Sequence, residues 1–206
     1  SFNAPIPGMS ADILNLDGQK VSTNEMGELV MRKSSIGLTK SLWNDDKRYI
    51  DNYWSVIKDY WVHGDLASRD ADGHWYLHGR SDDTIKVSGK RIGPSELESV
   101  IVKSGKAKEV AAVGIPDANK GSKIILSIVP AENNDQKESF FEDLVIKDLG
   151  KSFKPDKVIF VKDLPKTRNM KIMRRVIKSC LANQDPGDLS TLLNPESVEE
   201  IRSHAI

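Results

Sequence analysis

An aspartate and an arginine occupy similar settings in this sequence, each directly after a glycine. Asp65 follows Gly64 at the end of a predicted strand, and Arg80 stands further along before two more acids. A carboxylate in a turn can accept two hydrogen bonds from a ribose diol, and a neighbouring glycine lets the backbone approach a ligand closely. A guanidinium can bind ribose or phosphate oxygens through forked donors. The structural alternatives are a β-turn role for Asp65 and a surface salt bridge from Arg80 to Asp82 and Asp83.

Basic residues are concentrated around Lys171. An ammonium in such a cluster could bind a phosphate group and stabilise negative charge that develops on it. Nearby cations would favour an anionic ligand, and the alternative is a solvated basic loop before a helix. The flanking cations are Lys166, Arg168, Arg174 and Arg175.

A second basic segment covers residues 88–91. It reads as a short loop, in which Gly89 would let a slender ligand pass close to the backbone while Lys90 and Arg91 meet phosphates. A turn followed by a solvated charged pair explains the same residues equally well.

No metal site is predicted. His63, His74 and His78 lie at alternating strand positions without a cysteine partner, which is a weak pattern for a metal cluster. The single cysteine, Cys180, excludes an internal disulfide and fits a reducing compartment. A buried structural thiol is favoured for it over a catalytic one.

Composition narrows the class of protein. The chain has 206 residues, with 30 basic and 30 acidic side chains and a formal net charge of zero. This balance argues against a general binder of nucleic acid or anionic membranes. The sequence shows neither an apolar run that could cross a bilayer nor the pattern of a signal peptide, so we expect a cytoplasmic protein.

Hydrophobic periodicity predicts an α+β chain. The first eighty residues are β-rich with one short helix, and the second half alternates helices with strands, so that helices would pack on a small antiparallel or mixed sheet. The predicted strands cover 11–16, 19–21, 27–32, 61–63, 74–78, 109–115, 123–129 and 157–161, and the predicted helices cover 46–54, 94–101, 136–149 and 172–182. A further short helix is expected in the last stretch of the polar tail.

Three segments, in their order along the chain, resemble the last third of an acyl-CoA synthetase of the adenylate-forming (AMP-binding) superfamily. They are the Gly-Asp segment 60–65, the Gly-Arg and Ser-Gly-Lys-Arg segment 79–92, and the Leu-Pro-Lys-Thr-Arg to Lys-Ile-Met-Arg-Arg segment 164–175. The aromatic and charged pattern of 42–54 resembles acetyl- and other short- or medium-chain acyl-CoA synthetases most.

The resemblance implies a reaction and a set of roles. A carboxylate and ATP would form an acyl-adenylate and pyrophosphate, and CoA would then give acyl-CoA and AMP, with the C-terminal domain swinging between the half-reactions. The implied roles are Lys171 for catalysis, Asp65, Arg80 and Arg91 for ATP or AMP, Ser88, Gly89 and Arg91 for CoA, and Asp82 as the hinge.

The resemblance also implies a division of the chain. Residues 1–81 would be the barrel-like end of the large adenylating domain, 82–184 the mobile C-terminal domain, and 185–206 a polar tail. The phosphate loop and the adenine and metal segment of the family are absent, so we expect a C-terminal fragment that is inactive alone, with most Mg²⁺ ligands outside this chain. The alternative is a standalone, non-catalytic chain that binds a nucleotide or CoA, or a subunit whose partner carries the phosphate loop.

One position departs from the family pattern. The residue before the catalytic lysine is usually glycine, and here it is Met170. If that position needs a positive φ angle, methionine strains the turn. As in some relatives, Lys171 is also a candidate for regulatory acylation.

Overall fold

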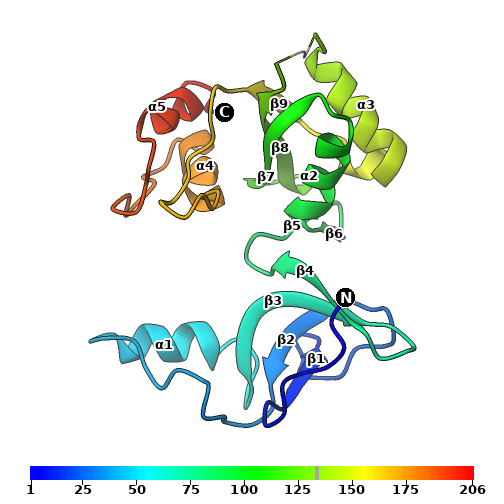
Figure 1. Cartoon of the computed structure of the whole chain (residues 1–206), viewed down its shortest axis with the longest axis vertical. Helices are drawn as coiled ribbons and strands as arrows, with labels where there is room; N and C mark the ends of the chain where they lie inside the picture. The colour runs from blue at the N-terminus through cyan, green and yellow to red at the C-terminus, as the bar shows by residue number, and fades with distance from the viewer. Residues whose placement is uncertain (133–134) are drawn as a thin grey trace. The chain divides into compact units, whose positions relative to one another are not determined.

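Alternating apolar residues in the first part of the chain pair into an antiparallel sheet. The computed structural model describes residues 1–132 and 135–206, which divide into two compact units, Ser1–Asp82 and Asp83–Ile206. The strands of the first unit have the order β1-β2-β3-β4 in an open sheet (Figure 1). They are β1 (Ala11–Leu14), β2 (Gly27–Met31), β3 (Trp61–Arg69) and β4 (Trp75–Arg80).

The single helix of this first unit, α1 (Asp46–Tyr53), forms where the sequence predicts it. Asp45 caps its N-terminus by accepting a hydrogen bond from the Arg48 N–H. Tyr49 is buried. The ring centroid of Tyr53 lies within 5.5 Å of the centroids of Tyr49 and Trp61, and the Tyr53 ring stacks on that of Trp61 in β3. The aromatic residues spaced four apart therefore fix the helix to the sheet.

A mixed sheet of three strands forms the centre of the second unit. The long hairpin of β7 (Ala107–Asp117) and β8 (Gly121–Pro130) is antiparallel, and β9 (Lys157–Phe160) adds to β8 in parallel. Both faces of this sheet are covered, which explains the uninterrupted apolar run Ile124 to Leu126 in β8.

Helices pack on both faces of the mixed sheet. The core on one face joins α2 (Pro94–Lys103) and α3 (Glu138–Leu149) to the sheet, and the core on the other face joins α4 (Arg174–Leu181) and α5 (Glu196–Arg202). Pro94 stands at the first turn of α2, and the Glu96 carboxylate accepts the Gly93 N–H, as the predicted helix start requires. The α+β class is confirmed.

Two short elements of the second unit were not predicted. A two-stranded hairpin, β5 (Ile85–Val87) and β6 (Lys90–Ile92), packs its apolar side chains into the same core as α2 and α3. A 3-10 turn, Lys151–Phe153, follows α3.

The last residues are anchored to the second unit despite their polar composition. Val198 and Ile201 of α5 are buried in the core beside α4. The Lys157 ammonium donates to the His204 carbonyl, and the Ile206 N–H donates to the Leu181 carbonyl. Among the helices that the structure describes, none has both the length and the apolar character that crossing a bilayer requires.

Candidate functional site

Asp65 and Arg80 are brought together as a cross-strand pair. Their Cα atoms are direct partners in the β3–β4 ladder, and Nη1 of Arg80 lies 3.6 Å from Oδ1 of Asp65. The Asp65 side chain is 19% exposed, so its carboxylate is partly shielded while one side remains open to solvent. The two residues that the sequence singled out separately thus form one polar group.

The prediction that Asp65 lies in a turn is wrong. Asp65 lies inside β3, which continues to Arg69 because β4 supplies backbone partners along this stretch. The chain instead departs from regular geometry one residue earlier, at Gly64, where φ is +83°. A Cβ atom at this position would stand 2.8 Å from Nη2 of Arg80. The glycine therefore makes room for the guanidinium.

Arg80 has further partners within the first unit. Its Nε donates to Oδ1 of Asp82 at 3.1 Å, and its Nη1 donates to the His63 carbonyl at 3.3 Å. The salt bridge to Asp82 that the sequence offered as a structural alternative is thus formed. Both side chains are more than half exposed. An exposed ion pair contributes about 0–1 kcal/mol, so an incoming phosphate or diol could displace it.

Ser88 and Gly89 form the two-residue turn of the β5–β6 hairpin, not an irregular loop. Val87 pairs with Lys90, and φ is +49° at Ser88 and +81° at Gly89. Two successive positive φ angles define a type I′ turn, which suits the twist of a tight hairpin. The Ser88 N–H donates to the Lys120 carbonyl at 2.8 Å, which fastens the turn to the β7–β8 hairpin.

The surface around this turn is open. A Cβ atom on Gly89 would meet no atom within 4 Å, so the backbone here is accessible to a ligand. Arg91, which belongs to β6, is exposed. Lys90 is engaged differently, because its ammonium donates to the Ser152 hydroxyl at 3.0 Å.

Lys171 ends a short hairpin-like turn. The Met170 N–H donates to the Thr167 carbonyl at 2.8 Å, the Thr167 N–H donates to the Lys171 carbonyl at 2.9 Å, and Lys166 bridges to Ile172. The Thr167 hydroxyl accepts the Lys171 N–H at 3.2 Å. Lys171 itself is exposed at the tip.

The φ angle of Met170 is +60°, so the condition under which methionine strains this turn is met. A left-handed residue at such a position in a tight turn is usually glycine, which adopts this conformation without strain. The Met170 side chain is 60% exposed, so burial of this side chain offsets little of the backbone cost.

The cations near Lys171 differ in what they contact. Lys166 is buried, and its ammonium lies 2.6 Å from carboxylate oxygens of both Glu109 and Asp163. Burial lowers the pKa of Lys166, but these two carboxylates raise it by more, so the pKa lies above its ordinary value. This side chain is a structural cation of the second unit.

Arg174 and Arg175 are also engaged. Arg174 forms a two-pronged ion pair with Glu98 of α2, at 2.9 and 2.7 Å. Arg175 donates to the carbonyls of Pro186 and Asp188. Of the five clustered cations, Arg168 and Lys171 are the two whose side chains have neither an ion pair nor a hydrogen bond among the described residues, and both are exposed.

The three histidines considered for a metal have separate surroundings. His63 lies beside Asp65, His78 hydrogen-bonds the Ser68 hydroxyl at 2.8 Å, and His74 contacts Asp70. Asp70, Asp72 and His74 do gather ligand atoms within 4.8 Å of one another. The Asp70 carboxylate, however, already accepts hydrogen bonds from the His74 N–H and the Tyr76 hydroxyl. These hydrogen bonds within the turn account for the clustering without a metal ion.

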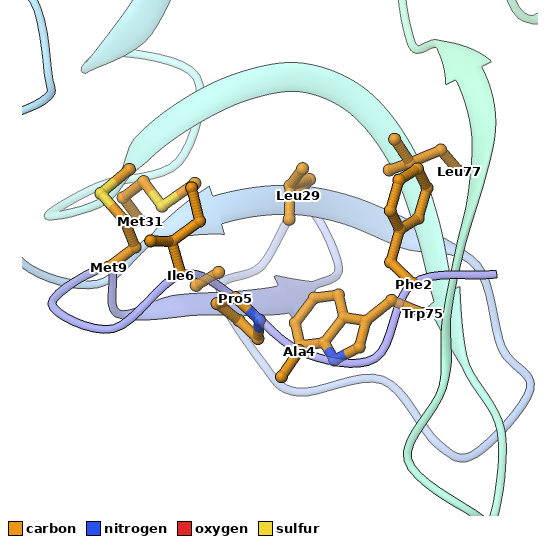
Figure 2. Close-up of a pocket in the computed structure, with 10 residues that line it drawn as sticks. Phe2, Ala4, Pro5, Ile6, Met9, Leu29, Met31, Trp75 and Leu77 are labelled. Atoms are coloured by element: carbon orange, nitrogen blue, oxygen red, sulfur yellow. The ribbon is translucent and has the colours of Figure 1, made fainter.

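An apolar hollow of about 230 Å³ lies on the first unit. Figure 2 shows Phe2, Pro5 and Ile6 from the N-terminal segment beside Leu29 of β2 and Trp75 of β4. Its lining carries almost no polar surface, so it offers no group that could orient a nucleotide.

Comparison with known proteins finds a matching domain and similar sequences. Residues 96–171 match the model of the AMP-binding enzyme C-terminal domain. The acetyl-coenzyme A synthetase of Methanothrix thermoacetophila is 40% identical over 204 residues, which cover 96% of this chain and 31% of that protein. The acetyl-coenzyme A synthetase of Helicobacter pylori strain P12 is 40% identical over 212 residues, which cover 97% and 32%.

Solved structures share the fold. Acetoacetyl-CoA synthetase from Streptomyces lividans superimposes with a TM-score of 0.85 at 22% identity, over 98% of this chain and 31% of that one. An amide bond synthetase from Marinactinospora thermotolerans gives a TM-score of 0.73 at 25% identity, over 85% and 35%.

Residues 96–171 therefore correspond to the C-terminal domain of AMP-binding enzymes. The chain is similar to acetyl-coenzyme A synthetases, and it spans about 31% of the length of the relatives it matches.

Proposed function

We propose that this chain is the C-terminal part of an ATP-dependent acyl-CoA synthetase that acts on acetate or another short- or medium-chain acid. The observation that carries the proposal is the exposed Lys171 ammonium, on a turn where the fold engages Lys166, Arg174 and Arg175 with protein groups. Because protein groups bind the other three cations, the exposed lysine on this turn is the one suited to present a positive charge to a ligand together with Arg168. Similarity to acetyl-coenzyme A synthetases supports the assignment.

Lys171 would act in the adenylation half-reaction. Its ammonium would face the α-phosphate of ATP and stabilise negative charge as the substrate carboxylate attacks and pyrophosphate leaves. Mg²⁺ would neutralise charge on the phosphates, with ligands mostly outside this chain. The neighbouring exposed Arg168 would add to the positive potential around the turn.

Asp65 and Arg80 would hold the nucleotide. The two carboxylate oxygens of Asp65 suit the two hydroxyl groups of a ribose, and Arg80 lies close enough to share the same ligand. The weak exposed pair of Arg80 with Asp82 would be exchanged for contacts to the nucleotide.

The β5–β6 turn would serve the second half-reaction. The open backbone at Ser88 and Gly89 would lie along the pantetheine arm of CoA, and Arg91 would meet phosphates. Exchange of the Lys171 turn for this hairpin would need a swing of the second unit, and Asp82, the last residue of the first unit, is our proposed hinge. Acylation of exposed Lys171 would remove its charge and stop adenylation.

The test uses the native polypeptide that carries this chain, whose mass is first measured by immunoblot in the source cells. A band far above 22.9 kDa supports the fragment, and a band near 22.9 kDa supports the alternative of a standalone binding chain or a subunit. On the native polypeptide, Lys171→Ala should abolish acetate-dependent ATP–pyrophosphate exchange while acyl transfer to CoA from supplied acetyl-adenylate continues.

The matched control is Lys178→Ala, another exposed lysine of the same unit, which should leave both half-reactions unchanged. Equal loss of both half-reactions in the Lys171 variant would contradict its assignment to adenylation. Mass spectrometry that finds Lys171 unmodified under all growth conditions would remove the acylation proposal alone.

A further inference from the structure

His63 lies beside the Asp65 carboxylate on the same strand. Its Nδ1 is 2.9 Å from Oδ2 of Asp65, whereas Arg80 approaches the other carboxylate oxygen, Oδ1, at 3.6 Å. The imidazole ring also packs edge-on against Trp61, with centroids 5.8 Å apart. The carboxylate is therefore placed between an imidazole on one side and a guanidinium on the other.

The protonation of this nitrogen follows from its surroundings. Nδ1 of His63 is shielded from solvent, and it approaches Oδ2 at hydrogen-bond distance without full hydrogen-bond alignment. An unprotonated Nδ1 would direct its lone pair at a carboxylate oxygen, which is unfavourable at 2.9 Å, whereas an Nδ1–H is attracted to it. The short contact with Oδ2 therefore favours the tautomer that carries its proton on Nδ1.

We infer that His63 is a positioning residue for Asp65. Through Nδ1–H it restrains Oδ2, and together with Arg80 at Oδ1 it fixes the plane of the carboxylate for a ribose diol. This inference rests on the proposed function, because it assigns the diol to Asp65. The charged groups that face this arrangement are Asp65 on β3, Arg80 on β4 and, through Arg80, Asp82.

Chemically matched variants separate the donor from the bulk of the ring. Asparagine carries its amide nitrogen on Cγ, as histidine carries Nδ1, so His63→Asn keeps a donor at the same position. His63→Leu keeps comparable volume without a donor. His78→Asn, at the histidine that contacts Ser68, is the control outside this group.

The measurement is calorimetric titration of the native polypeptide with AMP and with 2′-deoxy-AMP. His63→Leu should weaken AMP binding about fivefold, the loss of one ordinary hydrogen-bond contribution, and change 2′-deoxy-AMP binding less. His63→Asn and His78→Asn should retain the affinity for AMP and the preference for the full diol. A merely structural role would weaken both ligands equally and would not be rescued by asparagine.

Nitrogen-15 NMR of the imidazole tests the pairing without any ligand. The wild type should show His63 protonated on Nδ1, and Asp65→Ala should release that preference. A neutral ring protonated on Nε2 alone in the wild type, or AMP binding that His63→Leu leaves unchanged, overturns the inference about His63. Failure of the wild type to bind AMP overturns the proposed function, and the role of His63 in it, whatever the tautomer.

Discussion

Arg174 and Glu98 form a two-pronged ion pair that joins α4 to α2 across the mixed sheet. Glu98 also accepts the Ala112 N–H of β7, so one carboxylate links two helices and a strand. Burial lowers the pKa of Arg174, but the contact with Glu98 raises it by more, so the net shift is upward. The pair fixes the start of α4 immediately after the Lys171 turn.

Removal of one partner should destabilise the second unit strongly. We expect Arg174→Met to lower the free energy of unfolding by about 3 kcal/mol, because Glu98 is left charged and mostly buried. Urea unfolding followed by circular dichroism measures this. Arg168→Met, at an exposed cation of the same segment, should change stability by less than about 0.5 kcal/mol, and similar losses in both variants would contradict the structural role.

Met170→Gly should stabilise the Lys171 turn. A residue with a Cβ pays about 1 kcal/mol for the left-handed conformation, and glycine does not. Met170→Ala keeps that cost and should therefore leave the free energy of unfolding nearly unchanged. Equal effects of glycine and alanine would show that the methionine side chain, and not the φ angle, determines stability at this position.

Two substitutions in the β5–β6 turn should change the stability of the protein in opposite directions. Gly89→Ala should cost about 1 kcal/mol, because alanine is disfavoured at a φ angle of +81°. Ser88→Asn should stabilise the hairpin by a few tenths of a kcal/mol, since Asn-Gly is the preferred type I′ pair. Thermal unfolding of both variants gives the comparison, and a stabilising Gly89→Ala would be incompatible with the turn described.

The ionised carboxylate of Asp163 should stabilise the fold, and this stabilisation should be lost in acid. Burial raises the pKa of Asp163, but the Lys166 ammonium and the Leu164 N–H lower it by more, to below the ordinary 3.8. A carboxyl with a depressed folded-state pKa stabilises the fold above about pH 3.8, and this contribution is lost as the pH falls through the lower folded-state value.

The check is urea unfolding of wild type and Asp163→Asn between pH 6 and pH 2.5. The stability difference between the two proteins should be constant at the upper end and shrink below about pH 3.8. A difference that is independent of pH over this range would mean that the ionised carboxylate contributes nothing.

Much of the fold could be predicted because its signals are local. The helices α1 to α4 and the strands of the mixed sheet have apolar periodicities that define them within a few residues. The hairpin β5–β6 escaped prediction because its strands have three residues each and are stabilised by packing of Ile85 and Ile92 into the core. Helix α5 could be expected only as a short helix in the last stretch of the tail, because its sequence is short and polar, and Val198 and Ile201 join it to the core.

The sequence proposes candidate site residues, but it could not predict the contacts that these residues make in the structure. The glycine before Asp65 pointed to close approach, but which group approaches it, Arg80, depends on the strand register. The positive charges around Lys171 are equivalent in sequence, and burial beside Glu109 and Asp163 is what distinguishes Lys166. His63 was considered only for a metal, because its neighbour two residues on becomes its partner through the irregular backbone at Gly64.

The division of the chain at Asp82 also separates its chromophores. All four tryptophans and all four tyrosines, at positions 43, 49, 53, 54, 60, 61, 75 and 76, lie in the unit Ser1–Asp82. The unit that bears Lys171 therefore contains phenylalanine as its only aromatic side chain besides His204. Intrinsic tryptophan emission of this chain reports the Asp65 unit alone, and a tryptophan introduced near the Lys171 turn would add a signal from the other unit, read as the difference from the unsubstituted chain.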